Sequence, residues 1–215
     1  MTPVDTYPTK IMIIRHAEKP LLTQTPPVNG VTPNGDIDQD SLIVQGWQRA
    51  GALAVLFAPA RGQLQDPRLQ TPNFIYSIAP PSSDPDNDEG NRPEQTVAPL
   101  IAKLTTPGGA VTTNFEFGKD SGVQLIDSVL GCGGVVLICW PHGQIPDVAK
   151  QIPLSQNNTQ PLPTGKWPGD RFDMVWVFDE DNTEAGHYTF SQVPELLLAG
   201  DSPYPINGDD SKPNS

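Results

Sequence analysis

Short apolar runs recur along the chain and are separated by segments with a different periodicity. Residues 11–14, 133–140 and 172–178 are dominated by β-branched, aromatic and other apolar side chains. Such runs are typical of strands that are buried on both faces of a sheet. Weaker strand patterns cover 73–77 and 113–117. The chain is therefore expected to contribute about five strands to one sheet.

Between these runs, apolar residues recur every three or four positions, which is the spacing of one helical face. The expected helical faces comprise Ile43, Trp47, Ala50, Leu53, Ala54 and Phe57; then Val97, Leu100, Ile101 and Leu104 after Pro93; then Ile126, Val129 and Leu130; and a short segment at 145–150. Strands that alternate with helices predict an α/β protein, a three-layer sandwich with a mostly parallel central sheet.

The length of 215 residues suits one sizeable core, so a single domain is expected over 1–215. The 25 prolines and 19 glycines indicate long connecting loops. The segment from about Asp201 to the end is polar and is expected to be a mobile tail.

The formal net charge of −12 disfavours nucleic acids and anionic membrane surfaces as partners. A small phosphorylated substrate stays compatible with this charge, because a few converging cationic side chains can dominate a local field. The N-terminal segment lacks a signal-peptide pattern, and no apolar run reaches the roughly 20 residues of a membrane span. A cytoplasmic protein is therefore expected, and the pattern carries no signal for an oligomeric state.

Two of the three histidines directly follow the two most apolar strands. Arg15 and His16 come after the run at 11–14, and His142 comes after the run at 133–140. Because parallel strands end at the same edge of a sheet, these side chains are expected to converge there. One imidazole can attack phosphorus, while a second imidazole and guanidinium groups hold the phosphoryl oxygens.

Arg92, at the start of the second predicted helix, would supply another guanidinium group. An alternative for this residue is an ion pair with an acidic side chain of the preceding loop. The candidate partners in that loop are Asp84, Asp86, Asp88 and Glu89.

At these positions the sequence resembles the histidine phosphatase superfamily, which includes phosphoglycerate mutases and acid phosphatases. The motif Arg15-His16-Ala17-Glu18 is similar to the family's Arg-His-Gly/Ala-Glu, and Arg92-Pro93-Glu94-Gln95-Thr96 is similar to its Arg-x-x-Gln-Thr. His142-Gly143 matches the late His-Gly, and Gly46 before Arg49-Ala50 resembles Gly-x-x-Arg/Gln-Ala. The motifs follow one another in the family's order over residues 10–150.

The resemblance implies a phosphoglycerate mutase-like fold and a phosphatase that needs neither metal nor cofactor. His16 would be the nucleophile that becomes phosphorylated, Arg15 and Arg92 would bind the phosphoryl group, and His142 would complete the pocket. Lys19 would be an additional phosphate contact. The serine and asparagine that follow the first motif in mutases are missing here, which favours hydrolysis over a phosphomutase reaction.

The resemblance also implies a carboxyl group that protonates the leaving oxygen. Many family members carry it about 25 residues after the second arginine, which points to Glu116 or Asp120. Glu116, at the end of the strand expected at 113–117, is the first choice. Glu18 and Asp147 are the remaining candidates.

Two other functions compete with catalysis by phosphohistidine. His16, His142 and Glu18 could form a metal site, although two arginines in the same pocket would repel a divalent cation. A domain of the same fold could also bind a phosphorylated ligand without turning it over. The prediction from the sequence is a metal-independent phosphatase acting on phosphomonoesters.

Overall fold

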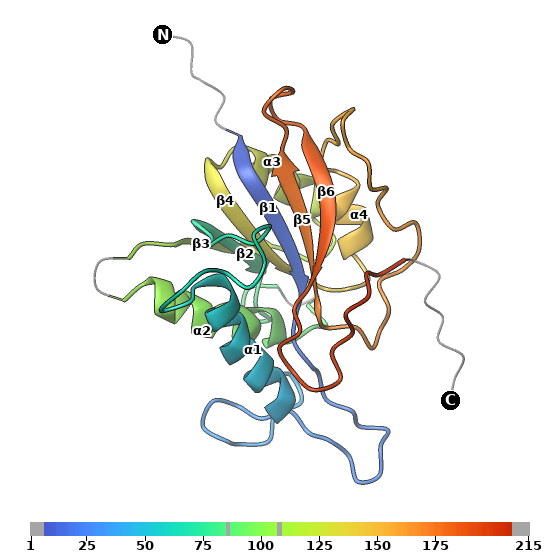
Figure 1. Cartoon of the computed structure of the whole chain (residues 1–215). Helices are drawn as coiled ribbons and strands as arrows, with labels where there is room; N and C mark the ends of the chain where they lie inside the picture. The colour runs from blue at the N-terminus through green and yellow to red at the C-terminus, as the bar shows by residue number, and fades with distance from the viewer. Residues whose placement is uncertain (1–6, 85–86, 107–108, 208–215) are drawn as a thin grey trace.

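A six-stranded sheet runs through the middle of the molecule (Figure 1), and the computed structural model describes residues 7–84, 87–106 and 109–207. The elements in chain order are β1 (Pro8–Arg15), α1 (Val44–Phe57), β2 (Phe74–Ile78), α2 (Arg92–Leu104), β3 (Thr112–Phe117), α3 (Gly122–Leu130), β4 (Gly134–Trp140), α4 (Ile145–Ala149), β5 (Met174–Glu180) and β6 (Tyr188–Pro194).

The strand order in the sheet is β3-β2-β4-β1-β5-β6. The first four strands in this order are parallel, whereas β5 runs antiparallel to β1 and β6 runs antiparallel to β5. The predicted α/β class with a mostly parallel sheet is confirmed in this mixed form. The finer prediction of a three-layer, phosphoglycerate mutase-like sandwich stays a prediction.

Both faces of the sheet are apolar because the central strands alternate their side chains between two hydrophobic clusters. Ile11 and Ile13 of β1 belong to a cluster with the buried residues of α3 and α4. Met12 and Ile14 belong to a second cluster with α1 and α2. Helices therefore lie on both sides of the sheet, as Figure 1 shows for α1 and α2 on one side and α3 and α4 on the other. Burial of both strand faces explains why the sequence of β1 is apolar at every position from 11 to 14.

The register between β1 and β4 brings the two histidine-bearing segments to the same level. Arg15 lies opposite Trp140, and each is the last residue of its strand. After β1 the chain passes through α1 to β2, which lies on the β3 side of the sheet. After β4 it passes through α4 to β5, which lies on the β6 side. The two connections therefore lead toward opposite edges of the sheet. This topology opens a crevice at the carboxyl ends of the two strands.

The segment from Asp201 onward differs from the mobile tail expected there. Ile206 is completely buried, Arg171 donates to the carbonyl of Tyr204 at 2.9 Å, and Gln192 Oε1 accepts from Ile206 N at 2.9 Å. Residues 201–207 therefore pack against the sheet and its loops, and 208–215 lie outside the described residues. Within the described chain, none of the helices has the length and apolar character needed to cross a bilayer.

Candidate active site

His16 and His142 meet at the carboxyl ends of β1 and β4. The His16 side chain is completely buried, and its Nδ1 lies 2.8 Å from the carbonyl oxygen of Ala17. A carbonyl oxygen only accepts hydrogen bonds, so Nδ1 carries the proton and Nε2 presents its lone pair when the ring is neutral. His142 is half-buried, and its Nδ1 has no hydrogen-bond partner among the described residues. The predicted convergence of the two histidines is present in the structure.

Arg15 is buried beside His16 and fixed by the loop that precedes β5. Its Nη1 donates to the carbonyls of Gly169 at 2.8 Å and Arg171 at 2.9 Å, and its guanidinium carbon lies 3.7 Å from the centre of the Phe172 ring. Nε and Nη2 are buried and have no hydrogen-bond partner in the described structure. Two donors of a fixed cation therefore stay available for an anion.

Arg92, the first residue of α2, is held in a similar way by backbone carbonyls. Its Nη1 donates to Gln39 O and its Nη2 donates to Asp88 O, each at 3.1 Å. Nη2 also lies 3.4 Å from Oε2 of Glu89, so the ion pair with an acidic residue of the preceding loop exists. Of the other candidate partners, Asp86 lies outside the described residues. Nε of Arg92 is buried without a hydrogen-bond partner there.

Glu89 is the site residue that the sequence did not identify as part of the chemistry. Its Oε2 lies 3.1 Å from His16 Nε2, but too far off the ring N–H direction to count as an aligned hydrogen bond. One ligand atom from each of His16, Glu89 and His142 lies within 4.8 Å of the others. The only sequence signal for Glu89 is its place three residues before Arg92.

The charges around the two histidines shift their proton affinities. Complete burial and the neighbouring Arg15 charge lower the pKa of His16, although Glu89 opposes this. Burial together with Arg15 and His16 lowers the pKa of His142 to about 4. Burial disfavours the ionised form of Glu89, but the contact with His16 and the charges of Arg92 and Lys19 outweigh it, so the pKa of Glu89 falls to about 2. At neutral pH the site therefore holds neutral imidazoles beside an ionised carboxylate.

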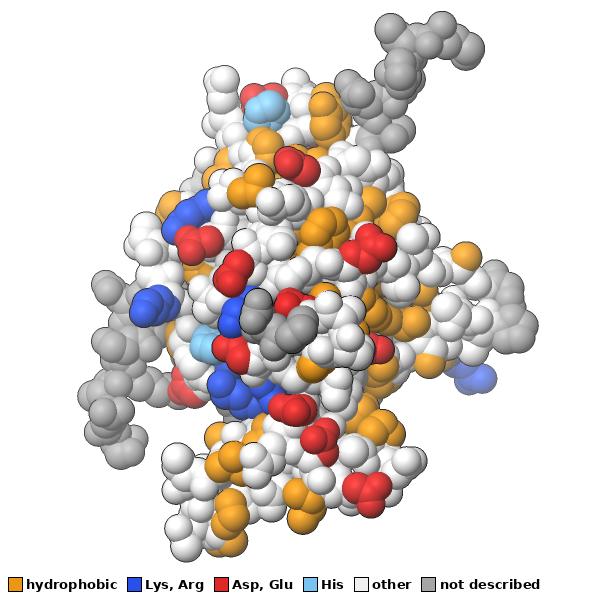
Figure 2. Space-filling view, turned by 180° about the vertical axis from the view of Figure 1, so that it is seen from behind, with side chains coloured by type: hydrophobic (Ala, Val, Ile, Leu, Met, Phe, Trp, Pro, Cys, Tyr) orange, Lys and Arg blue, Asp and Glu red, His pale blue; other side chains and the backbone are white. Residues whose placement is uncertain are grey.

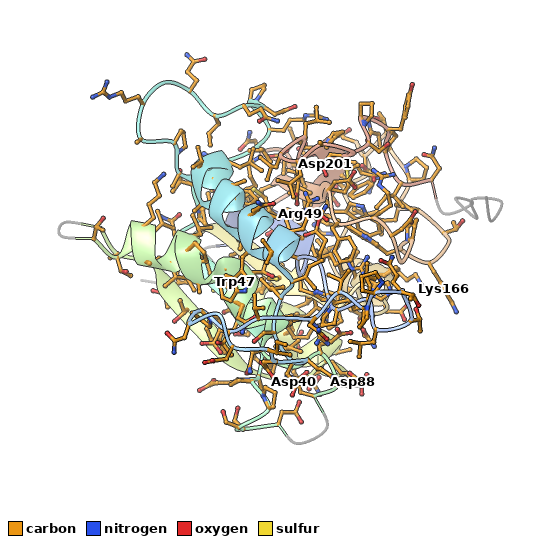
Figure 3. The ribbon with its side chains drawn as sticks, turned by 90° about the horizontal axis from the view of Figure 1, so that it is seen from below. Asp40, Trp47, Arg49, Asp88, Lys166 and Asp201 are labelled. Atoms are coloured by element: carbon orange, nitrogen blue, oxygen red, sulfur yellow. The ribbon has the colours of Figure 1, made fainter. Side chains whose placement is uncertain are left out.

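Glu18, one of the proposed proton donors, points away from this chemistry into an ion cluster. Its Oε1 accepts from Nε and Nη2 of Arg49 at 3.0 and 2.8 Å. Arg49, on α1, also bonds Glu195 at 2.9 Å and Asp201 at 2.7 Å. Figure 3 shows Arg49 and Asp201 next to each other. Glu18 therefore serves to anchor α1 to the segment that follows His16.

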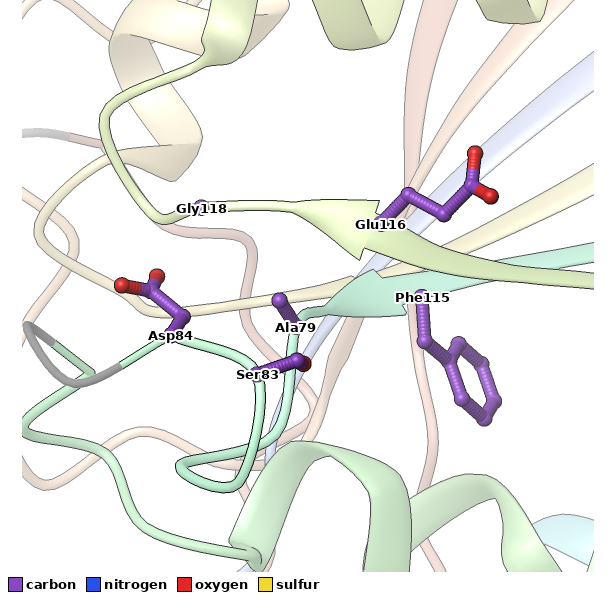
Figure 4. Close-up of a pocket in the computed structure, with 6 residues that line it drawn as sticks. All are labelled: Ala79, Ser83, Asp84, Phe115, Glu116 and Gly118. Carbon is purple, nitrogen blue, oxygen red and sulfur yellow. The ribbon is translucent and has the colours of Figure 1, made fainter.

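The structure does not bring Glu116 to the histidines. Glu116 is exposed on β3, which is the edge strand, three strand positions (about 14 Å) from β1. It lines a different cavity with Ala79, Ser83, Asp84, Phe115 and Gly118, and in Figure 4 its carboxylate points away from Asp84. The assignment of Glu116 as proton donor is corrected for this reason.

The two remaining candidate donors also lie elsewhere. Asp120 and Asp147 line a separate surface cavity beside α4, and Asp147 is paired with Lys150 at 2.7 Å. Among the described carboxylates of the chain, Glu89 is the one found within hydrogen-bond distance of a ring nitrogen of His16.

Lys19 lies close enough to the histidines for its charge to act on the site. It is half-buried, and with Glu18 and Phe172 it lines a cavity of about 500 Å³ between the loop after β1 and the loop before β5. Its charge reaches both Glu89 and His142, where it lowers the pKa of each. Basic, acidic and histidine side chains also lie close together in the middle of the face shown in Figure 2. The predicted phosphate contact thus acts on the charges of the site and also lines this cavity.

No protein-family model matches the sequence, and no curated protein matches it. Among solved structures, the fold is similar to the crystal structure of a candidate phosphohistidine phosphatase, SixA from Agrobacterium tumefaciens. The two chains are 16% identical, the match covers 81% of this chain and 94% of that chain, and the TM-score is 0.43. At these values the likeness establishes neither the family nor the activity of this chain.

Proposed function

We propose that this chain is a single-domain, metal-independent phosphatase of the histidine phosphatase superfamily, with that family's three-layer fold. It would hydrolyse small phosphomonoesters through a phosphohistidine on His16. The observation that carries the proposal is the buried His16 ring: its Nδ1 is fixed on the Ala17 carbonyl, its Nε2 lies 3.1 Å from Glu89, and the ring lies close to His142 and to the charge of Arg15.

The tautomer of His16 supports its role as the nucleophile. With Nδ1–H donated to Ala17 O, a neutral ring has its lone pair on Nε2, which is the atom that faces the pocket. Burial and Arg15 keep the ring neutral at pH 7 by lowering its pKa. Once the Glu89 carboxylate has moved off Nε2, the nucleophile therefore needs no separate base to deprotonate it.

The cations around Nε2 suit a transferring phosphoryl group. Arg15 and Arg92 offer buried N–H donors without partners in the described structure, and Lys19 adds a third positive charge. His142 is neutral at pH 7 and can donate one ring N–H to a phosphoryl oxygen. In the first step Nε2 attacks phosphorus and the alcohol leaves; in the second step water hydrolyses the phosphohistidine.

A metal site is the second candidate, because His16, Glu89 and His142 form a two-histidine, one-carboxylate group within 4.8 Å. Arg15, Arg92 and Lys19 disfavour it, since their charges fall on the same site and repel a divalent cation while attracting a phosphate dianion. A domain that binds a phosphorylated ligand without turnover is the third candidate.

The decisive experiment measures phosphate release from a panel of phosphomonoesters in the presence of a chelator. We expect turnover by the wild-type protein, loss of turnover in His16→Ala, and an acid-labile, base-stable phosphoenzyme after rapid quenching of the wild type only. The matched control is His187→Ala, because His187 is the third histidine and lies in the turn before β6, away from the site.

Each contrary result points to one alternative. Turnover that disappears with chelator would favour the metal site. Phosphate binding without turnover would favour the binding domain. Full activity of His16→Ala would remove the proposed mechanism altogether.

A further inference from the structure

The backbone that carries Glu89 is fixed by a frame of hydrogen bonds within the loop after β2. Nδ2 of Asn87 donates to the carbonyls of Ala79 at 2.8 Å and Gly90 at 3.1 Å, and its Oδ1 accepts from Glu89 N at 2.8 Å. Gly90, at φ 61°, packs so closely on Asp40 that a Cβ there would lie 2.6 Å from the Asp40 carbonyl oxygen. This frame fixes the backbone of Glu89 beside the site, and its hydrogen bonds do not involve the Glu89 carboxylate.

The carboxylate of Glu89 stands where a phosphoryl group would have to bind. Its Oε2 lies 3.1 Å from Nε2 of His16 and 3.4 Å from Nη2 of Arg92. A phosphorus atom that is to be attacked must approach Nε2 to about 3–3.5 Å. An ester and the Glu89 carboxylate therefore compete for the same space and for the same cations.

The charged and titratable groups around Glu89 come from every element packed on it. The groups whose charges interact with Glu89 are Arg15, His16 and Lys19 after β1, Arg92 on α2, Lys119, and His142 after β4. Glu18 and Asp170 act on Arg15. Arg92 and Lys19 favour the ionised form of Glu89. A bound dianion would pair with these cations in place of Glu89. It would also bring two negative charges beside a carboxylate whose side chain is only 14% exposed, which favours the protonated form of Glu89.

We infer that the Glu89 carboxylate occupies the position that the phosphoryl group takes in the complex, and that a phosphomonoester dianion displaces this carboxylate, which then takes up one proton from solution. The inference rests on the proposed function, because it requires the dianion to bind beside His16. Substrate binding thus places on Glu89 the proton that the leaving oxygen needs.

The displaced and protonated Glu89 then has a chemical role that neither Glu116 nor Glu18 can fill from its position. When Nε2 of His16 forms its bond to phosphorus and the P–O bond breaks, the proton of Glu89 passes to the leaving oxygen and an alcohol departs. In the second step, the Glu89 carboxylate takes a proton from the attacking water, the N–P bond breaks, and hydrogen phosphate is released with Glu89 protonated again. Release of the product returns this proton to solution.

The test is a calorimetric titration with tungstate, a tetrahedral dianion that does not itself titrate near neutral pH. Binding is measured in two buffers with different ionisation enthalpies, so the difference in heat gives the number of protons taken up. For the wild-type protein we expect an uptake close to one proton per bound tungstate.

Glu89→Gln keeps the size and the frame of Glu89 but removes its charge and its titration. We expect it to bind tungstate at least about tenfold more tightly, because no carboxylate competes for Arg92 and Lys19, and to take up no proton. Asp127→Asn is the matched control: it removes one negative charge from an exposed position of α3. Its affinity and its proton uptake should equal those of the wild type.

Kinetic measurements with two kinds of ester distinguish a proton-donating role of Glu89 from a purely structural role. With alkyl phosphates, whose leaving oxygen needs a proton, Glu89→Gln should lower kcat by about 10²–10⁴-fold. With p-nitrophenyl phosphate, whose leaving group is stable as an anion, the loss should be at least about tenfold smaller. Equal losses for both esters would remove Glu89 as the proton donor.

The outcomes distinguish the inference from the function on which it rests. If neither the wild type nor Glu89→Gln binds tungstate, the phosphate pocket itself is wrong. If the wild type binds without proton uptake and Glu89→Gln binds no more tightly, the pocket stands and displacement of Glu89 is wrong. Uptake that persists in Glu89→Gln would assign the proton to another group, such as His142, and would also overturn the inference.

Discussion

The nucleophilic role proposed for His16 depends on a neutral imidazole, and the surroundings of this residue provide one. Burial removes the water that would stabilise an imidazolium, and Arg15 adds a repelling charge, so the pKa of His16 falls. The same two causes, with His16 itself, lower the pKa of His142 to about 4. The site thus combines uncharged rings with guanidinium groups whose charge is permanent, because even Arg15 keeps a pKa of about 10.

At the residue scale, Lys19 allows a test of the phosphate contact that does not touch the nucleophile. Lys19→Met should raise KM about three- to tenfold with little change in kcat, because a cation near the site attracts substrate and transition state alike. The effect should shrink as salt is added. Steady-state kinetics at low and high ionic strength measures both.

Lys166→Met is the control for that prediction, since it removes one lysine from an exposed position of the loop before β5. A KM increase of the same size in Lys166→Met would show that only the total charge matters. An unchanged KM in Lys19→Met would remove Lys19 from the site.

The sequence allowed part of the candidate site to be predicted, and the missed part has a physical reason. Arg15, His16 and His142 could be placed because they lie at or just after the end of a strand whose burial is visible in its apolar run. Glu89 could not be placed, since its contact with His16 depends on the path of an irregular loop, which no periodicity describes. Glu116 was misplaced because its distance along the chain from Arg92 says nothing of how far β3 lies from β1 in the sheet.

At the scale of whole elements, the close approach of α1 to the segment after β1 positions the site. A Cβ built on Gly46 would lie 2.6 Å from the carbonyl oxygen of Glu18, so only glycine lets the helix come this near. One turn further, Arg49 binds the Glu18 side chain. The helix thus holds both the backbone and the side chain of the residue two positions beyond His16.

Gly46→Ala is therefore expected to lower the free energy of unfolding by about 2 kcal/mol or more and to reduce turnover, because the added methyl group pushes α1 away from Glu18. The matched control is Gly51→Ala in the same helix, where a Cβ meets nothing within 4 Å. That variant should be more stable than the wild type by about 0.5–1 kcal/mol, as alanine favours a helix. Urea unfolding of the wild type, Gly46→Ala and Gly51→Ala measures these differences. Equal free energies of unfolding for the three proteins would contradict the close approach of α1 to Glu18.

Most helices and strands could be read from apolar periodicity, and the exceptions lie at one side of the sheet. The face expected over 43–57 became α1, and the apolar run at 133–140 became β4. β6 was not predicted as a strand because only one of its faces is buried, so polar residues interrupt the pattern. The antiparallel direction of β5 was also missed, since an apolar run does not encode the direction in which its strand is paired.

At the scale of the molecule, Arg49 connects three distant parts of the chain. Its guanidinium group binds Glu18 after β1, Glu195 after β6, and Asp201 in the segment first expected to be a mobile tail. Three carboxylates around one guanidinium group leave excess negative charge in a buried place. The excess is reduced at Glu195. Burial raises the pKa of Glu195 to about 8, although Arg49 opposes this rise, so the carboxyl group holds a proton at neutral pH.

The raised pKa of Glu195 predicts how stability depends on pH. Between the usual carboxyl pKa of 4.5 and the folded value of about 8, the folded protein holds a proton that the unfolded chain has released. The stabilisation associated with this proton is complete below pH 4.5 and is lost as the pH rises through about 8. Glu195→Gln, which keeps the shape without the titration, should remove this part of the decline in the free energy of unfolding, on the order of 1–4 kcal/mol.

Chemical denaturation of the wild type and Glu195→Gln from acid to alkaline pH measures this difference, with Glu184→Gln on the turn before β6 as a surface control. If the difference in unfolding free energy between the wild type and Glu195→Gln stayed constant across that range, Glu195 would be ionised throughout, and Arg49 would be balancing three full negative charges.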